Sequence, residues 1–229
     1  MNKDIAFEIN KDFFRKKLIT NTWKAYHMLP NIDKPRILDI GCGSGIPTIE
    51  LAVLSKGQIK AVDKDNAALL WLKEKIKALF LTKHIKTYKC DITKLKFKKN
   101  YFDIIWSEGA VSSIGFINGI KMWHRFLKNN GYMVIHDEIK DYQKKLQAIS
   151  ECGYKLLNHF TIPAVEWFNK YFKPLEKRIL ELKNKYSNNS HAIEILEKEE
   201  YEIVLFKSRP DDFGSVFYII QKNTDNSRS

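Results

Sequence analysis

The chain has 229 residues, of which 44% are hydrophobic and 29% are charged, fractions that exclude a disordered or collagen-like chain and are typical of a globular protein. Its 39 Lys and Arg against 27 Asp and Glu give a net charge of +12, which permits a polyanionic partner without requiring one. No apolar run is long enough to span a membrane and the N-terminal segment lacks a secretory leader pattern, so we expect a cytoplasmic protein without a membrane span.

Residues 4–28 carry apolar side chains at helical spacing and predict one or two amphipathic helices ahead of the core. Pro30 and Pro35 bracket a polar connection that opens onto a short apolar run at 36–40, which predicts a buried parallel strand. Strands and helices then alternate. We expect further strands at 58–62, 85–90, 102–106, 132–136 and 154–160, and helices at 47–55, 66–81, 116–127 and 142–151.

Residues 163–189 break this alternation with a long amphipathic stretch, which Pro174 should kink or divide. A second helix at 192–201 and a final strand at 215–220 follow. The stretch holds four aromatic residues, which either roof a substrate pocket or simply pack within the helices: Trp167, Phe168, Tyr171 and Phe172.

Alternating strands and helices of these lengths predict right-handed βαβ units and therefore an α/β fold with a Rossmann-like, doubly wound, mainly parallel sheet of seven strands. We expect a single domain over residues 1–229. It would consist of an N-terminal helical cover at 1–30, a core at 31–160 and 211–222, and a helical cap inserted at 163–210 before the last strand.

The most informative segment leads from the first strand directly into three closely spaced glycines, Gly41, Gly43 and Gly45. Glycines let the backbone turn tightly and approach a ligand at the carboxyl edge of such a sheet. A dinucleotide-binding loop reads GxGxxG, whereas here the third glycine comes one residue earlier and Asp39 stands two residues before the first. A carboxylate at that position suits a cationic ligand better than a diphosphate.

Acidic residues also follow the next two strands. Asp63 ends the second strand, where a carboxylate can accept both hydroxyl groups of a ribose. Asp91 and Ile92 follow the third strand and offer a polar and an apolar neighbour to a purine ring. Because the carboxyl ends of parallel strands meet at one edge, these residues predict a nucleoside site there.

These motifs resemble the class I S-adenosylmethionine-dependent methyltransferases, and most closely the small-molecule enzymes of the ubiquinone/menaquinone-methyltransferase type. The resemblance covers residues 36–160 and the terminal strand, through LDIGCGSG, the VD step at 62–63, CDI at 90–92 and FDIIWSEGA at 102–110. It implies the class I methyltransferase fold and S-adenosyl-L-methionine as cofactor. The cofactor-binding residues it implies are Asp39, Gly41, Cys42, Gly43, Gly45, Asp63, Lys64, Asp91, Ile92 and Ser107.

Two residues are the candidates for catalysis. A sulfonium methyl group is already activated, so its transfer is accelerated by holding the nucleophile close, excluding water and, where required, removing a proton. Glu108, at the end of the fourth strand, is the first candidate for binding or deprotonating the acceptor, and His136, after the fifth, is the next. We expect the acceptor, a small molecule, between Glu108, the N-terminal helices and the cap.

Two other functions stay open. An RNA methyltransferase would use the lysine-rich stretch 83–99 as a phosphate track, and a non-catalytic protein would bind S-adenosylmethionine without an acceptor pocket. RNA is the less favoured acceptor, because only six of the 39 basic residues are arginines. Cys42, Cys90 and Cys152 lack CxxC spacing, so we expect free thiols and no metal site.

Overall fold

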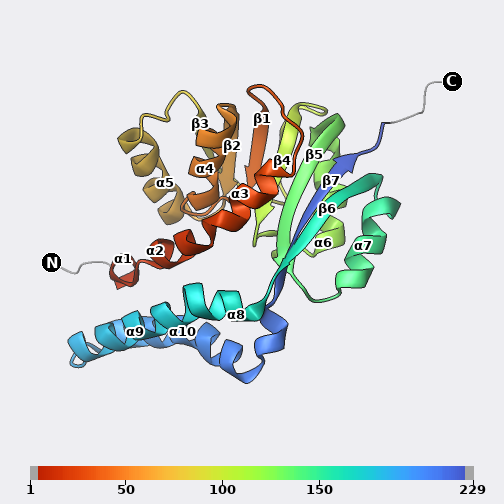
Figure 1. Ribbon diagram of the computed structural model, residues 1–229. Coiled ribbons are helices and arrows are strands. Elements are labelled where there is room, and N and C mark those ends of the chain that lie inside the picture. Colours follow the sequence, from red (N-terminus) through yellow and green to blue (C-terminus); the bar gives the residue numbers. More distant parts are fainter. Residues whose placement is uncertain (1–4, 225–229) are drawn as a thin grey trace.

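The computed structural model describes residues 5–224 and shows one central sheet flanked by helices (Figure 1). The strands are β1 Arg36–Ile40, β2 Gln58–Asp63, β3 Ile85–Lys89, β4 Phe102–Glu108, β5 Leu127–Glu138, β6 Tyr154–Ile162 and β7 Ser215–Lys222. The α-helices are α1 Ile5–Ile9, α2 Lys11–Arg15, α3 Ile19–His27, α4 Ile46–Ser55, α5 Asn66–Ala78, α6 Phe116–Trp123, α7 Tyr142–Glu151, α8 Ala164–Trp167, α9 Lys173–Lys185 and α10 Ser190–Ser208. The 3₁₀ turns are η1 Lys16–Leu18, η2 Val111–Ser113, η3 His124–Phe126 and η5 Pro210–Phe213, and η4 Phe168–Phe172 is a π-helical turn.

The strand order is β3-β2-β1-β4-β5-β7-β6, and only β7 runs antiparallel to its neighbours. This topology confirms the predicted seven-stranded, Rossmann-like sheet. The order reverses between β1 and β4, where the chain switches from one half of the sheet to the other. Ligands of doubly wound folds bind outside the carboxyl ends of the strands at such a switch point.

Two hydrophobic cores form on the two faces of the sheet. Leu51 of α4 and Leu72 of α5 pack on one face together with Ala25 of α3. Ile120 of α6 and Ile149 of α7 pack on the other face. All five side chains are almost fully excluded from solvent, so both faces of the central strands are covered.

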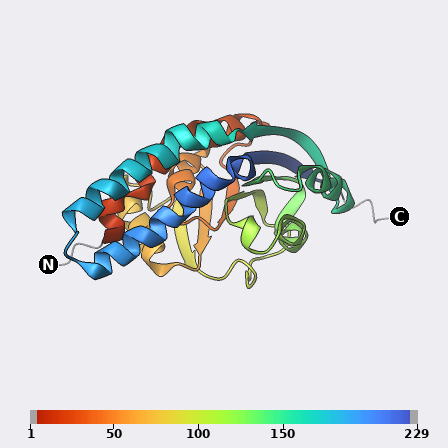
Figure 2. The ribbon, with the colours of Figure 1, turned by 90° about the horizontal axis from the view of Figure 1, so that it is seen from below.

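A third core joins the N-terminal segment to the cap, and Figure 2 shows α9 and α10 running side by side next to the N-terminal helices. Ile9 and Phe14 of the N-terminal segment are buried against Ile179 of α9 and Leu196 of α10. The first two helices therefore pack on the cap, while α3 continues onto the sheet. None of the helices within residues 5–224 combines the length and apolarity needed to cross a bilayer.

Several predicted boundaries are wrong although the elements exist. The helix predicted at 116–127 ends at Trp123, because a 3₁₀ turn follows and Leu127 is already extended, with φ −79° and ψ 134°. Strand β5 consequently begins at Leu127 rather than at residue 132. The helix predicted to reach residue 81 ends at Ala78, since Phe80 adopts a left-handed φ of 57° and Leu81 N–H donates to the Ile76 carbonyl.

The helical stretch is not divided at Pro174, because the backbone stays helical from residue 164 to residue 185, but its hydrogen bonding changes just before the proline. Regular helix α9 starts at Lys173, with Pro174 in its first turn, and the π-helical turn η4 connects it to α8. Lys173 N–H donates to the Phe168 carbonyl, five residues earlier, so a π-helical turn precedes the proline within the helical stretch. Helix α10 is longer than the predicted 192–201 and begins after Asn189, whose side chain accepts a hydrogen bond from Ala192 N–H.

Candidate active site

The glycine loop between β1 and α4 has three glycines with positive φ, at 74° for Gly41, 52° for Gly43 and 84° for Gly45. A Cβ on Gly41 would lie 2.1 Å from the Ala110 Cβ, and one on Gly45 would lie 2.2 Å from the Leu72 Cδ1. A Cβ on Gly43 would meet no described atom within 4 Å. Packing therefore requires the first and third glycines, whereas the second faces open space that a ligand can fill.

Asp63, at the end of β2, holds this loop in place. Its Oδ2 accepts a hydrogen bond of 2.7 Å from Gly43 N–H, and its Oδ1 accepts one of 2.8 Å from Asp65 N–H. The backbone N–H groups of Gly41 and Cys42 donate to the Val62 carbonyl. A carboxylate has about four lone-pair positions, so Asp63 keeps acceptor capacity for further donors.

The four strand-end side chains lie on one face of the sheet: Asp39, Asp63, Glu108 and His136. Each of the four follows, by two residues, a core side chain that packs beneath α3, α4 and α5. Asp39 lies on the same face, because its Oδ2 accepts a 2.6 Å hydrogen bond from Thr48 of α4. Side chains alternate between faces with a period of two, which is why strand register alone brings these residues together.

Asp39 is only 2% exposed. Burial raises the pKa of Asp39 to about 7, although the hydrogen bond from Thr48 opposes this rise. The neighbouring charge of Asp63 adds to the rise. A buried carboxylate with a second carboxylate nearby is stabilised in its ionised form by an added cation.

Glu108, at the end of β4, connects the sheet to the N-terminal segment. Its Oε1 accepts hydrogen bonds from Trp106 Nε1 at 2.7 Å and from Thr22 Oγ1 of α3 at 2.9 Å. Burial raises the pKa of Glu108 to about 7, against the lowering effect of these two donors. No described residue donates to Oε2, which leaves one carboxylate oxygen for a ligand.

His136, at the end of β5, is 9% exposed and lies among aromatic rings. Its ring stacks on Phe217, with centroids 4.5 Å apart, and on Trp167 of the cap, with centroids 5.9 Å apart. Its Nε2 lies 2.8 Å from Ser215 Oγ. Burial lowers the pKa of His136 to about 4, so the ring is neutral near pH 7.

The other predicted cofactor residues are arranged differently. Ser107 is buried and donates its hydroxyl to the Ile40 carbonyl, which joins β4 to β1. The Cys42 thiol is buried, and burial raises its pKa above the usual range. Asp91 accepts from the backbone and side chain of Thr93, whereas Lys64 is exposed. Ser107 and Asp91 are therefore engaged by partners within the protein, the Cys42 thiol is buried, and Lys64 faces solvent.

Ile92 and most of the cap aromatics pack in hydrophobic cores, and only some of these predicted residues lie at the site. Ile92 packs partly buried against the core beneath α6. Of the four cap aromatics, Trp167 alone reaches the sheet edge, through its stack on His136. Tyr171 and Phe172 are buried in the third core, and Phe168 stacks on Phe206 of α10. The cap aromatics thus pack among themselves, with Trp167 as the exception.

An N-terminal contact to the glycine loop was not predicted. Asp12 of α2 accepts 2.6 Å and 2.5 Å hydrogen bonds from Ser44 Oγ and Lys75 Nζ, and Lys75 also donates to the Ser44 carbonyl. The N-terminal segment therefore covers the loop on the side of α5. No sequence pattern signalled this contact, because its three residues are far apart in the chain.

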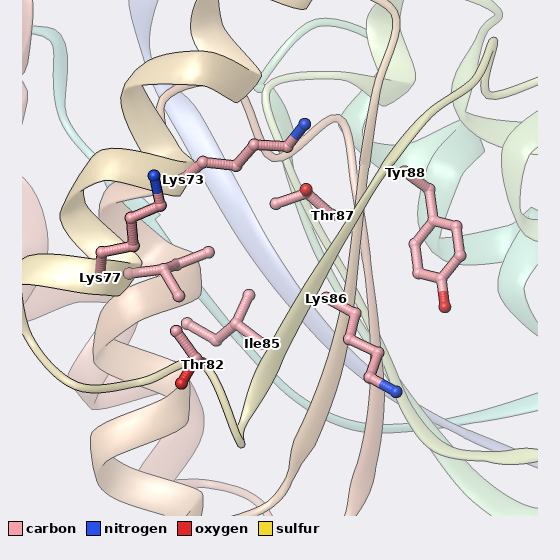
Figure 3. A pocket seen from close by; sticks show the side chains of 8 residues that line it. Lys73, Lys77, Thr82, Ile85, Lys86, Thr87 and Tyr88 are labelled. Carbon is pink, nitrogen blue, oxygen red and sulfur yellow. The ribbon is translucent and has the colours of Figure 1, made fainter.

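The lysine-rich stretch lies along edge strand β3, remote from Glu108 in the strand order. A cavity of about 500 Å³ there is lined by the residues shown in Figure 3, which include Lys73, Lys77 and Lys86. A second cavity, of about 460 Å³, lies on the cap beside Phe168 and Phe206. Neither cavity contains a residue of the predicted site.

Replacing Asp63 by alanine is expected to weaken binding of S-adenosylhomocysteine roughly 10- to 100-fold, because hydrogen bonds to a charged acceptor contribute about 1.5–3 kcal/mol. The variant also loses the acceptor for Gly43 N–H. Asp63→Asn keeps one oxygen acceptor and should fall between wild type and Asp63→Ala. Isothermal titration of the three proteins measures this order, and equal affinities would show that Asp63 does not contact the ligand.

Residues 38–135 match the sequence family described as "Methyltransferase domain". Among curated proteins, the ribosomal protein L11 methyltransferase of Ruminiclostridium cellulolyticum is 28% identical over 142 residues, which are 62% of this chain and 44% of that protein. An uncharacterized protein of Haemophilus influenzae is 30% identical over 105 residues, or 44% of this chain and 42% of that protein. The chain thus spans less than half the length of the curated relatives it matches.

Solved structures share the fold across nearly the whole chain. A methyltransferase from Thiobacillus denitrificans, dependent on S-adenosylmethionine and in complex with S-adenosylhomocysteine, superposes with a TM-score of 0.75 at 16% identity, covering 97% of this chain and 100% of that one. The [4+2]-cyclase SpnF also has a TM-score of 0.75, at 15% identity, covering 89% of this chain and 80% of that one. At these identities the likeness shows the fold, and the chemistry has to be argued from the site.

Proposed function

We propose that the chain is a class I methyltransferase that transfers a methyl group from S-adenosylmethionine to a small-molecule acceptor, which the methyltransferase-domain match over residues 38–135 and the shared fold support. The observation that carries the proposal is the open position beside Gly43, next to the Asp63 carboxylate and at the switch point of the sheet. A ligand there meets backbone that no Cβ shields.

The charge at this edge fits a cationic donor. Asp39, Asp63 and Glu108 are close enough that Asp63 affects the pKa of Asp39, and Asp39 that of Glu108. No Lys or Arg within residues 5–224 forms an ion pair with any of the three. A sulfonium and an ammonium group would relieve their mutual repulsion. When bound, S-adenosylmethionine supplies a methyl group already activated for displacement.

In this proposal the protein's own residues bind and orient the cofactor and take a proton from the acceptor. Gly43 and Asp63 would hold the ribose side of the cofactor, and Asp39 would lie near its ammonium group. Glu108 has an unengaged Oε2 and a pKa raised to about 7, the range in which a carboxylate can take a proton from an acceptor at neutral pH. The proton would pass from the acceptor's nucleophilic atom to Glu108.

Side chains from the N-terminal segment and the cap lie over the ends of β4 and β5, and this arrangement favours a small acceptor. Thr22 of α3 donates to Glu108, and Trp167 of α8 stacks over His136, so side chains from the N-terminal segment and the cap close this edge. A folded RNA would have to displace both. The lysine-lined cavity lies at β3, on the far side of β1 and β2 from Glu108, and adds no support for RNA.

A methyl-transfer screen tests the proposal. The protein is incubated with S-adenosylmethionine labelled in its methyl group and with fractionated metabolite extracts, and a matched set contains total RNA. Label in a small-molecule fraction that depends on Glu108 supports the proposal. Label in RNA alone, or binding of the cofactor without transfer to any fraction, would contradict it.

The rate should depend on pH in a defined direction. Glu108 acts as a base only when ionised, so kcat/KM is expected to rise between about pH 6 and pH 8. Asp39 and Glu108 both have a pKa raised to about 7. The midpoint of the pH profile is therefore a joint property of these two carboxyl groups. His136, with its pKa lowered to about 4, stays neutral over this range and adds no inflection. A flat profile would remove proton transfer to Glu108 from the mechanism.

A further inference from the structure

A hydrogen-bonded chain joins the cap to the sheet edge through Trp167, Ser215 and His136. Trp167 Nε1 lies 2.8 Å from Ser215 Oγ, and the same oxygen lies 2.8 Å from His136 Nε2. Ser215 is buried. The three residues come from α8, β7 and β5, so the chain forms only in the folded protein.

The donor and acceptor capacities of the three groups favour one direction for this chain of hydrogen bonds. An indole N–H can only donate, so Ser215 Oγ accepts from Trp167. The Ser215 hydroxyl hydrogen then needs an acceptor, and His136 Nε2 is the one that the described residues provide. Because Nε2 accepts, the proton of the neutral imidazole is on Nδ1.

The imidazole ring of His136 is held between two aromatic rings, which restricts its rotation. Phe217 stacks on it at an interplanar angle of 21°, and Trp167 stacks on it at 13°. No described residue accepts a hydrogen bond from Nδ1. His136 pairs in register with Glu108 on the neighbouring parallel strand, and such strands lie about 4.8 Å apart.

We propose that Trp167 and Ser215 are positioning residues that hold His136 as the Nδ1–H tautomer, in which it donates a hydrogen bond to an oxygen atom of the methyl acceptor. Beside it, Glu108 accepts a proton from the nucleophile. The edge thus presents a donor and an acceptor on adjacent strands. The matching substrate class has an acidic O–H or N–H with a second oxygen, from a carbonyl, hydroxyl or carboxylate group, next to it. The role toward the acceptor rests on the proposed methyl transfer, whereas the tautomer does not.

Long-range ¹H–¹⁵N correlation spectra of the ligand-free, full-length protein test the tautomer. The His136 signals are assigned by their loss in His136→Gln. We expect a protonated Nδ1 and an unprotonated Nε2 in the wild type, loss of this preference in Ser215→Ala, and its return in Ser215→Thr, which keeps the hydroxyl. An Nε2–H tautomer in the wild type, or an unchanged spectrum in Ser215→Ala, would overturn the assignment.

The role of His136 as a hydrogen-bond donor is tested by methyl transfer. The substrate is the metabolite fraction that the wild-type protein labels. The amide nitrogen of an asparagine lies near the position of Nδ1, whereas that of a glutamine reaches toward Nε2. We expect His136→Asn to stay within about 10-fold of wild type and His136→Gln to lose roughly 10²-fold, the range for an unpaired polar group in a buried site.

The outcomes separate this proposal from the proposed function. Equal, severe losses in both His136 variants would indicate a base and overturn the donor role, and wild-type turnover in both would show that His136 does not touch the acceptor. His159→Gln, a substitution on β6 outside the chain of hydrogen bonds, is the matched control. If no fraction is labelled although the tautomer is found as expected, the proposed methyl transfer fails and the assignment of His136 stands.

Discussion

Replacing Gly43 by valine is expected to reduce the affinity for S-adenosylmethionine by at least 10²-fold while the protein still folds. The valine Cβ would enter space where no described atom lies within 4 Å, so the folded protein can accommodate it but a ligand cannot. The φ of 52° strains any residue with a Cβ, at a cost of roughly 1–3 kcal/mol, which is less than the stability of a typical domain. Isothermal titration and circular dichroism together measure the effect.

Two matched variants separate strain from ligand exclusion. Gly153, after α7, has a φ of 81° and lies outside the predicted site, so Gly153→Val should lower the melting temperature to a similar extent but leave cofactor affinity unchanged. Gly41→Val would place its Cβ 2.1 Å from the Ala110 Cβ and should destabilise the fold more strongly. Wild-type affinity in Gly43→Val would mean that the loop does not approach the ligand.

Replacing Glu108 by glutamine is expected to lower kcat by roughly 10²-fold or more, with cofactor affinity within a few-fold of wild type. The glutamine amide oxygen can still accept hydrogen bonds from Trp106 and Thr22, so the cover over β4 is retained. The variant loses only the ability to take a proton. Single-turnover rates and calorimetric affinities, measured on the same preparation, separate these two effects.

Glu50 provides the matched control for this substitution. Its carboxylate also accepts a hydrogen bond from an indole, that of Trp23, but it does so from α4 at an exposed position. Glu50→Gln should therefore leave kcat unchanged. Full activity in Glu108→Gln would show that proximity alone accounts for the transfer and would leave His136 as the next residue to test.

The sequence predicts those parts of the site whose residues lie within one strand and the loop that follows it. The glycine spacing after β1 and the acid at the end of β2 are local patterns, and the strand order then brings them to one edge without further information. Strand register likewise places Glu108 beside His136. For these residues, sequence position and the period of a strand determine location.

Several polar partners of the site were not predictable, because Thr22 and Ser215 come from elements remote in the chain and no spacing rule identifies Thr48. Thr48 and Thr22 donate to Asp39 and Glu108, Ser215 Oγ lies within hydrogen-bond distance of His136, and no spacing rule connects these pairs. The packing of the N-terminal helices on the cap is similarly nonlocal, since Ile9 and Ile179 are separated by most of the chain. An amphipathic pattern indicates that a helix buries one face but does not identify what covers it.

Element ends were missed where a residue other than glycine adopts a left-handed conformation. Phe80 closes α5 with a φ of 57°, a position usually occupied by glycine or asparagine, so the sequence carried no stop signal. These shifts alter boundaries by a few residues and leave the carboxyl edge of the sheet unchanged.

Calorimetric titration of the wild-type protein with S-adenosylhomocysteine tests the central claim most directly. The open position at Gly43 and the acids at the ends of β1, β2 and β4 predict saturable binding to a single site, abolished in Gly43→Val and weakened in Asp63→Ala. Absence of heat from the folded protein, together with binding of a nicotinamide dinucleotide under the same conditions, would contradict the assignment of this edge to S-adenosylmethionine.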